Sequence, residues 1–171
     1  MITMNRSELL KPFIDRLEIE EDCLDEGLDL TIGPSTLTAE SLEEIYKQIP
    51  LRFSKLYEKL LLTYHWPDAE IDECCFYGCT TSGGWQGLVD KIKRDQFLFD
   101  TCVKANFLPF GKGADYNYDP LCFDLNECKK GEPAIVMLYH EAILCYEKVQ
   151  INKKIARNFE QFIRERCLAR S

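Results

Sequence analysis

Few side chains in this sequence lie in a pattern that could catalyse a reaction. The chain holds only two histidines, His65 and His140, and neither occurs in a motif that pairs a general base with a nucleophile. Ser82-Gly83-Gly84 is not a nucleophile elbow, because that turn needs a glycine on both sides of the serine. Gly111 and Gly113 lack the third glycine and the βαβ context of a dinucleotide-binding loop. We therefore expect neither enzymatic activity nor a cofactor.

The cysteines offer sulfur ligands, but their spacing does not form a zinc site. Cys74, Cys75 and Cys79 are the tightest cluster, and His65 lies upstream of them. A structural zinc site takes two ligand pairs at short, fixed spacing, and here only one irregular pair is present. We expect these cysteines to fill apolar core positions, and we predict no metal there.

A second cluster of possible metal ligands begins like a calcium-binding loop. Asp115, Asn117 and Asp119 place three oxygen donors at alternate positions. The glycine that such a loop needs at its sixth position is Pro120, and the glutamate at its twelfth position is Asn126. We therefore expect these loop side chains to bond their own backbone rather than a calcium ion.

The acidic side chains form a pattern that suits binding to a protein. Between Leu17 and Tyr46 there are ten acids and no lysine or arginine, so this stretch carries −10 and the remaining residues sum to +2. The acids before residue 30 are Glu18, Glu20, Glu21, Asp22, Asp25, Glu26 and Asp29. Such a segment would steer a basic partner towards the protein, or it would simply be a solvated surface. The sequence favours neither interpretation.

Aromatic residues supply the other possible contacts with a partner. Trp85 follows a Gly-Gly pair, while Tyr116 and Tyr118 lie beside Asp115 in a Gly- and Asp-rich segment. The favoured interpretation is that these rings pack into the core of the sheet. The alternative is that Trp85, Tyr116 and Tyr118, with Asp115, form an exposed anchor for a protein, since aromatic side chains dominate binding energy when they enter a pocket.

Length and composition limit the class of protein. The chain has 171 residues, of which 46% are apolar and 12% aromatic, which favours one folded domain. The net charge of −8 argues against a nucleic-acid binder, because phosphate binding needs clustered lysine and arginine. No apolar run approaches the ~20 residues that span a bilayer, and the N-terminus lacks the features of a secretory signal. We therefore expect a cytoplasmic protein whose nine cysteines are reduced.

Apolar periodicity and turn residues predict the elements that position these side chains. The predicted helices span Ser7 to Asp22, Thr38 to Ile49, Phe53 to Tyr64, Gln86 to Asp100 and Ile151 to Leu168. The predicted strands span Ile71 to Gly78, Phe107 to Phe110, Leu121 to Leu125 and Ala134 to Tyr139, the last as a central strand. Together they indicate an α+β fold, with a twisted antiparallel sheet flanked by N-terminal and C-terminal helices.

The order of four segments is similar to that of a known family. These segments are LTAESLEEIYKQIPLRFSKLYEKLLLTYH, NFLPFGKGADYNYDPLCFDL, GEPAIVMLYHE and IARNFEQFIRER. In this order and spacing they resemble the SUKH superfamily over roughly residues 37–165, a group that includes fungal cell-wall synthesis regulators and many bacterial immunity proteins. The turn ADYNYDP departs from the glycine that members often carry just before the following strand, because Pro120 lies there.

The resemblance implies a protein that binds without catalysis. Bacterial relatives look like antidotes that bind a cognate toxin, often a nuclease, and block it. It therefore implies an immunity protein with a toxin as partner, and alternatively a regulatory or scaffold protein of the same fold. A small-molecule-binding protein or hydrolase would need a polar pocket. We expect no nucleic-acid or membrane partner, and the oligomeric state stays open.

The sequence divides into two parts that we expect to pack as one unit. Residues 1–36 would form an N-terminal helix and an acidic extension outside the common core, and residues 37–171 the SUKH-like domain. The stretch from Lys148 to Arg170 carries a net charge of +5. It could pair with the acidic segment, within one molecule or between two.

Overall fold

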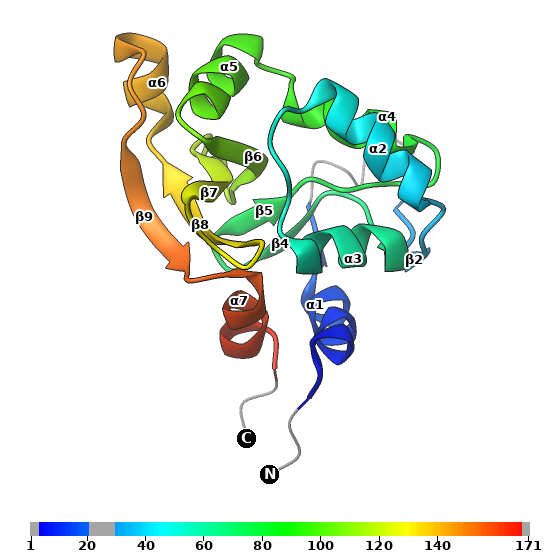
Figure 1. Ribbon diagram of the computed structural model, residues 1–171. Helices are drawn as coiled ribbons and strands as arrows, with labels where there is room; N and C mark the ends of the chain where they lie inside the picture. The colour runs from blue at the N-terminus through cyan, green and yellow to red at the C-terminus, as the bar shows by residue number, and fades with distance from the viewer. Residues whose placement is uncertain (1–3, 21–29, 169–171) are drawn as a thin grey trace.

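The protein is built on one large antiparallel sheet with helices against both of its faces (Figure 1). The structure, a computed structural model, describes residues 4–20 and 30–168. The sheet has seven strands in the order β1, β4, β5, β6, β7, β8 and β9, and all neighbours are antiparallel. The predicted α+β fold with its antiparallel sheet and flanking helices is therefore confirmed.

The strands of the sheet are short at one edge and long at the other. Their bounds are β1 Glu18–Ile19, β4 Ala69–Ile71, β5 Cys74–Phe76, β6 Phe107–Gly113, β7 Pro120–Lys129, β8 Glu132–Leu138 and β9 Ile151–Ala156. Two further strands, β2 (Gly33–Pro34) and β3 (Tyr64–His65), pair with each other in a separate small sheet.

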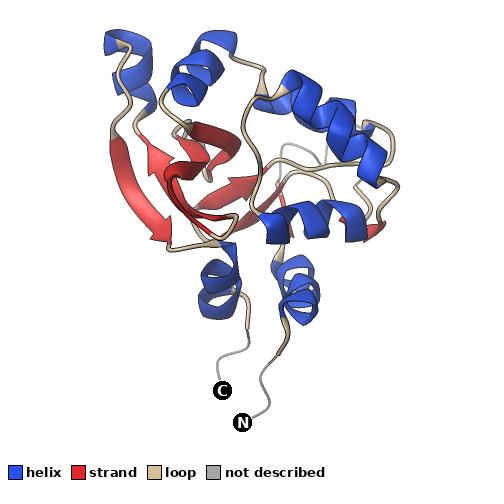
Figure 2. Cartoon of the chain, viewed as in Figure 1, coloured by secondary structure: helices blue, strands red, loops and turns tan. Residues whose placement is uncertain are grey.

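The helices account for most of the remaining regular structure, as Figure 2 shows. They are the 3-10 helix Arg6–Leu9 and α1 Leu10–Arg16, α2 Ala39–Gln48, α3 Lys55–Thr63, α4 Gly84–Ile92, α5 Gln96–Lys104, α6 His140–Tyr146 and α7 Phe159–Arg166. Within residues 4–20 and 30–168, no helix combines the length and the apolar character needed to cross a membrane.

The first face of the sheet carries the main core. Side chains alternate along each strand, so Phe110 of β6 and Phe123 of β7 point to the same face, where their rings stack 3.9 Å apart. Tyr57 of α3 packs against both rings, and it also meets Phe159 of α7. Phe13 of α1 lies 5.2 Å from Phe159, which brings α1 and α7 side by side (Figure 1).

The second face is covered by helices over only part of its width. Cys102 of α5 and Ile143 of α6 pack on the residues of β7 and β8 that alternate with those of the main core, including Cys122 and Val136. This smaller cluster lies at the β7–β8 side of the sheet. The side formed by β1, β4, β5 and β6 carries the two hollows described below.

Several predicted elements are confirmed. The helix expected from Thr38 is α2, and the Thr38 N–H donates to Ser41 Oγ at 3.0 Å in its first turn. The helix after Pro50 is α3, whose N-cap Ser54 accepts from the Tyr57 N–H. The strand predicted over Ala134 to Tyr139 is β8. It is an interior strand that pairs with β7 and β9, and it lies next to the edge strand β9.

The first predicted helix, Ser7 to Asp22, is wrong in its C-terminal half. Helix α1 ends at Arg16, and Leu17 is already extended. Glu18 and Ile19 leave the helical path because they pair with Glu70 and Ala69 at the edge of the sheet. The acids Glu21, Asp22, Asp25, Glu26 and Asp29 lie outside the described residues.

The helix predicted from Ile151 to Leu168 is also wrong, because it is two elements. Residues Ile151–Ala156 form strand β9, which pairs with β8, and α7 begins only at Phe159. Asn158 separates them as the N-cap of α7, accepting from the Gln161 N–H at 2.8 Å. Helix α6 was not predicted.

Two other predicted elements are each divided by a turn. The strand predicted over Ile71 to Gly78 is the hairpin β4–β5, and its turn holds Asp72 at a φ of 52°. The helix predicted over Gln86 to Asp100 is α4 followed by α5, because Asp95 caps a new helix by accepting from the Leu98 N–H.

The basic C-terminal stretch does not pair with the acidic segment among the described residues. Arg166 pairs with Asp72 and Glu73 of the β4–β5 turn, and Lys153 also reaches Glu73. Within the described acidic segment, Glu20 pairs with Lys112 instead.

Candidate binding surface

Two neighbouring hollows lie beside strands β1, β4, β5 and β6. The larger one, called the groove here, has a volume of about 960 Å³, and the smaller one, called the acidic hollow, about 450 Å³. The groove is lined by residues that include Glu20, Asp68, Tyr77, Lys91, Arg94, Leu98, Pro109, Lys112, Tyr118, His140 and Leu144. The acidic hollow is lined by Arg16, Glu18, Ile19, Glu20, Glu70, Asp72, Asp115 and Tyr116. Glu20 lines both, so the two hollows adjoin.

Strand register places the acids of the acidic hollow together. Glu18 of β1 lies directly opposite Glu70 of β4, and Glu70 lies opposite Cys75 of β5. Cross-strand partners share one face of a sheet, and two like charges in such a pair destabilise it. The pairing of Glu18 with Glu70 therefore lowers the stability of this edge of the sheet.

The electrostatics of the acidic hollow show the same excess of negative charge. Burial raises the pKa of the Glu70 carboxyl, and the nearby charges of Asp115 and Glu20 raise it further, against the opposite effect of Lys112. Among the described residues that line the acidic hollow, Arg16 is the one lysine or arginine beside five carboxylates, and it pairs with Glu18 at 3.6 Å and with Asp72 at 3.0 Å. A positive group brought by a partner would relieve this repulsion.

The loop between β6 and β7 presents an aromatic ring at the same place. Tyr116 is 79% exposed. Asp115 and Tyr116 both adopt positive φ, at 55° and 63°, a backbone conformation that side chains other than glycine rarely adopt. The loop is held in this shape because the Ala114 N–H donates to the Glu73 carbonyl and the Asn117 N–H to the Ala114 carbonyl.

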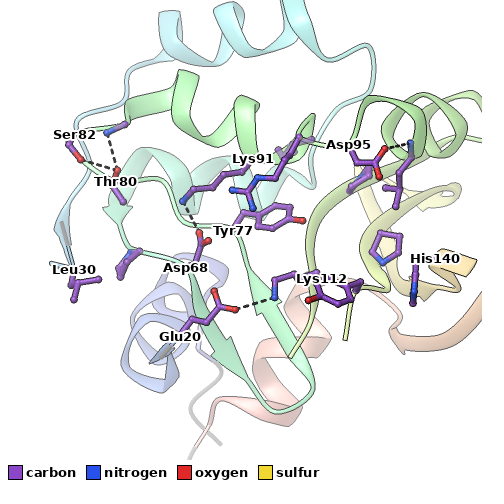
Figure 3. Close-up of a pocket in the computed structure, with 18 of the residues that line it drawn as sticks. Glu20, Leu30, Asp68, Tyr77, Thr80, Ser82, Lys91, Asp95, Lys112 and His140 are labelled. Carbon is purple, nitrogen blue, oxygen red and sulfur yellow. Dashed lines mark hydrogen bonds and ion pairs between the residues drawn. The ribbon is translucent and has the colours of Figure 1, made fainter. Parts of the chain in front are cut away.

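The groove contains ion pairs along its middle, as Figure 3 shows. Lys91 Nζ lies 2.7 Å from Asp68 Oδ1, and Lys112 Nζ lies 3.1 Å from Glu20 Oε1. Tyr77 lies between these pairs and the α4–α5 end of the groove, and burial raises the pKa of its hydroxyl. The groove is thus a concave cluster of titratable groups, so the small-molecule class of function is not dismissed by the shape of the surface.

A hydrogen-bonded histidine lies on the side of the groove away from Thr80 and Ser82 (Figure 3). His140 Nδ1 is 2.6 Å from Asp119 Oδ1, which also accepts from the His140 backbone N–H at 3.0 Å. Asn152 donates to the second oxygen of Asp119 at 2.8 Å. Burial would raise the pKa of Asp119, but these hydrogen bonds outweigh it and hold the pKa below its usual value. The carboxylate therefore stays ionised and fixes the His140 ring.

The structure brings together some of the residues predicted as partner contacts. Glu18, Glu20, Asp115 and Tyr116 line the acidic hollow, and Tyr118, which is 63% exposed, lines the groove. Trp85 differs from them: it lies in the first turn of α4, is half-buried against the main core and lines neither hollow.

Sequence reasoning missed other residues of the two hollows. Glu70 and Asp72 flank Ile71 in the acidic hollow, and this alternation of acids with an apolar residue was the available signal. Nothing local marks Arg94 or His140 as lining one groove, because Arg94 lies in the turn between α4 and α5 and His140 begins α6.

The one group of possible metal ligands among the described residues does not suit a metal ion. Glu20, Glu70 and Cys75 offer ligand atoms within 4.8 Å of one another. The Lys112 ammonium already pairs with Glu20, and burial raises the pKa of the Cys75 thiol, so sulfur stays protonated. Of the loop side chains expected to bond their own backbone, Asn117 does so, because its Oδ1 accepts from the Asp119 N–H at 2.9 Å, whereas the Asp119 carboxylate accepts from His140 and Asn152.

One family model matches most of the chain. The model of the SMI1 / KNR4 family (SUKH-1) matches residues 36–165, which include the strands from β3 to β9 and most of the lining of the groove. Glu18 and Glu20 precede the matched range. No curated protein matches the chain.

Proposed function

The chain belongs to the SMI1/KNR4 (SUKH-1) family, as the order of its motifs predicted, and on this premise we propose that it is a non-catalytic protein-binding domain whose acidic hollow receives a basic partner. The observation that supports this most is the convergence of five carboxylates around one concave surface: Glu18, Glu20, Glu70, Asp72 and Asp115.

The chemistry of the acidic hollow suits lysine or arginine side chains of a partner. An arginine fork or an ammonium entering it would face the Glu70 carboxyl, whose pKa is raised first by burial and then by the nearby charges of Asp115 and Glu20. Tyr116 stands beside them and would add apolar contact area next to the ion pairs. Complementary charge of this kind speeds association more than it slows dissociation.

The partner in this proposal is a cognate bacterial toxin of the nuclease kind, met in the cytoplasm. A nuclease presents a basic surface to nucleic-acid phosphates, and an acidic surface that covers it would compete with those phosphates. The alternative is a regulatory or scaffold protein of the same fold, which would use the same acidic hollow for a basic segment of another partner.

The experiment measures binding to the toxin domain encoded beside this gene, with its catalytic residue inactivated. We expect one-to-one binding that weakens as salt rises. Asp115→Lys should slow association several-fold at low salt, because it removes part of the steering field. Glu43→Lys, which changes the net charge equally at an exposed site outside both hollows, should leave the rate close to the wild-type value.

Two results would count against this function. If Asp115→Lys and Glu43→Lys slow association equally, the acidic hollow is not the contact surface. If the neighbouring gene encodes no toxin, or its product neither binds nor is neutralised, the regulatory alternative replaces the immunity function.

A further inference from the structure

The groove has the size and lining of a ligand-binding site. Its volume of about 960 Å³ lies at the upper end of the range for small-molecule and cofactor sites. At the end formed by α5 and α6, apolar side chains line it, among them Leu98, Leu144 and Pro109. Leu144 is 49% exposed and the nearby Tyr118 is 63% exposed, so apolar surface faces solvent here.

Among the described lysine and arginine residues that line the groove, one side chain is not held in an ion pair. Lys91 and Lys112 are held in ion pairs with Asp68 and Glu20. Arg94 also lines the groove, and within the described residues its guanidinium has no ion pair and no hydrogen bond. A planar guanidinium matches the two oxygens of a carboxylate, so Arg94 points to a ligand that carries one.

The hydrogen bonds of His140 leave one acceptor for a ligand. Asp119 is an ionised carboxylate and can only accept, so His140 Nδ1 must carry the proton of their 2.6 Å hydrogen bond. In the neutral ring Nε2 is then an acceptor, and no described residue bonds to it. The ring is held in place by Asp119, which Asn152 holds in turn.

These three features match the groups on the last residue of a peptide. We propose that the groove binds the C-terminus of a polypeptide that ends in a large apolar residue. Its carboxylate pairs with Arg94, its backbone N–H donates to His140 Nε2, and its side chain lies against Leu98 and Leu144. One terminal residue carries all three groups, whereas an internal acidic residue beside an apolar one places them on two. This inference does not depend on which partner occupies the acidic hollow.

The test uses three short peptides with acetylated N-termini. The first ends in leucine with a free carboxylate, the second is its C-terminal amide, and the third carries an internal glutamate beside leucine and ends in an amide. Calorimetry gives affinity, and NMR of the His140 ring and the Tyr118 and Leu144 signals reports the place of binding. We expect the free acid to shift these signals and to bind about tenfold more tightly than either amide, because only it offers a terminal carboxylate.

Variants separate the groove from the rest of the surface. Arg94→Gln should weaken binding of the free acid about tenfold and leave the amides unchanged. Arg157→Gln is the matched control, since Arg157 is an exposed arginine outside both hollows. Leu144→Ala should weaken all binding of leucine-ended peptides, and its half-exposed position keeps the fold intact.

Three results would overturn the proposal. The first is equal binding of acid and amide, the second is equal binding of the internal-glutamate peptide, and the third is no shift of the groove signals at millimolar peptide. An unaltered affinity in Arg94→Gln, with the same melting temperature as wild type, would also refute the role of Arg94.

Discussion

Replacing Glu73 by glutamine tests the ionic contact that holds α7 against the β4–β5 turn. Two guanidinium nitrogens of Arg166 donate to the two carboxylate oxygens of Glu73, at 2.9 and 3.2 Å. Lys153 Nζ donates to Glu73 Oε1 at 3.1 Å. The hydrogen bond from Arg166 is the largest cause that lowers the pKa of Glu73, which falls from 4.5 to about 2 despite partial burial. Glu73→Gln keeps the shape of the side chain and removes its charge.

The size of the effect follows from that pKa. A fall from 4.5 to about 2 corresponds to at most about 3.4 kcal/mol, at roughly 1.36 kcal/mol for each pKa unit. The Glu73 side chain is 32% exposed, so solvent screening reduces the loss to about 1–2 kcal/mol. Because the folded-state pKa is lowered, this stability is fully present above pH 4.5 and disappears as the pH falls towards 2.

Urea unfolding followed by circular dichroism measures this difference across a pH series. At pH 7 Glu73→Gln should lower the free energy of unfolding by about 1–2 kcal/mol, and the gap from wild type should shrink below pH 4.5. Glu127→Gln is the control: Glu127 lies 2.8 Å from Lys154, but both side chains are about half exposed, so the change should cost under about 0.5 kcal/mol. Equal losses in the two variants, or a gap that does not change with pH, would refute the reasoning.

Four further substitutions test the packing and the backbone conformation of the fold, each by urea unfolding. Tyr57→Phe should leave stability unchanged or raise it by about 1 kcal/mol, because the buried Tyr57 hydroxyl has no hydrogen-bond partner among the described residues; a clear loss would contradict this. Gly131→Ala should lower the free energy of unfolding by about 1–2 kcal/mol, because Gly131 has a φ of +78°. Gly87→Ala should raise it by about 0.5–1 kcal/mol, because Gly87 lies within α4 and a Cβ there meets open space. Phe110→Ala should cost about 3–5 kcal/mol, and a loss below about 1 kcal/mol would show that this fully buried ring is not central to the core.

Local patterns predicted the elements whose burial lies along one face. The apolar residues from Phe53 to Tyr64 recur with the helical period, and Leu56, Tyr57, Leu60 and Leu61 form the buried stripe of α3, while Tyr64 already belongs to β3. The continuous apolar run of β8 is typical of a strand covered on both faces, and in the structure the two faces meet different cores. Such patterns depend on neighbours in the chain, so they can be recognised without knowing the fold.

The wrong predictions share a cause that no local pattern contains. Ile151, Ile155 and Phe159 have the spacing of a helix, yet the first two belong to β9, which β8 pairs with. Glu18 and Ile19 continue a helical pattern, but in the structure they form strand β1 and pair with β4. In both places a hydrogen-bonding partner from a distant segment outweighs local preference.

The sequence by itself determined the fold class, the family and the acidic character of the segment before residue 30, because these depend on composition, periodicity and the order of motifs. Only the tertiary structure decided that Glu18 and Glu20 would meet Asp115 and Tyr116. It also brought His140 within hydrogen-bonding distance of Asp119, and it placed His140 and Arg94 in the lining of the same groove. These contacts join segments far apart in the chain, and cross-strand register and helix packing, which no single segment encodes, bring them within reach.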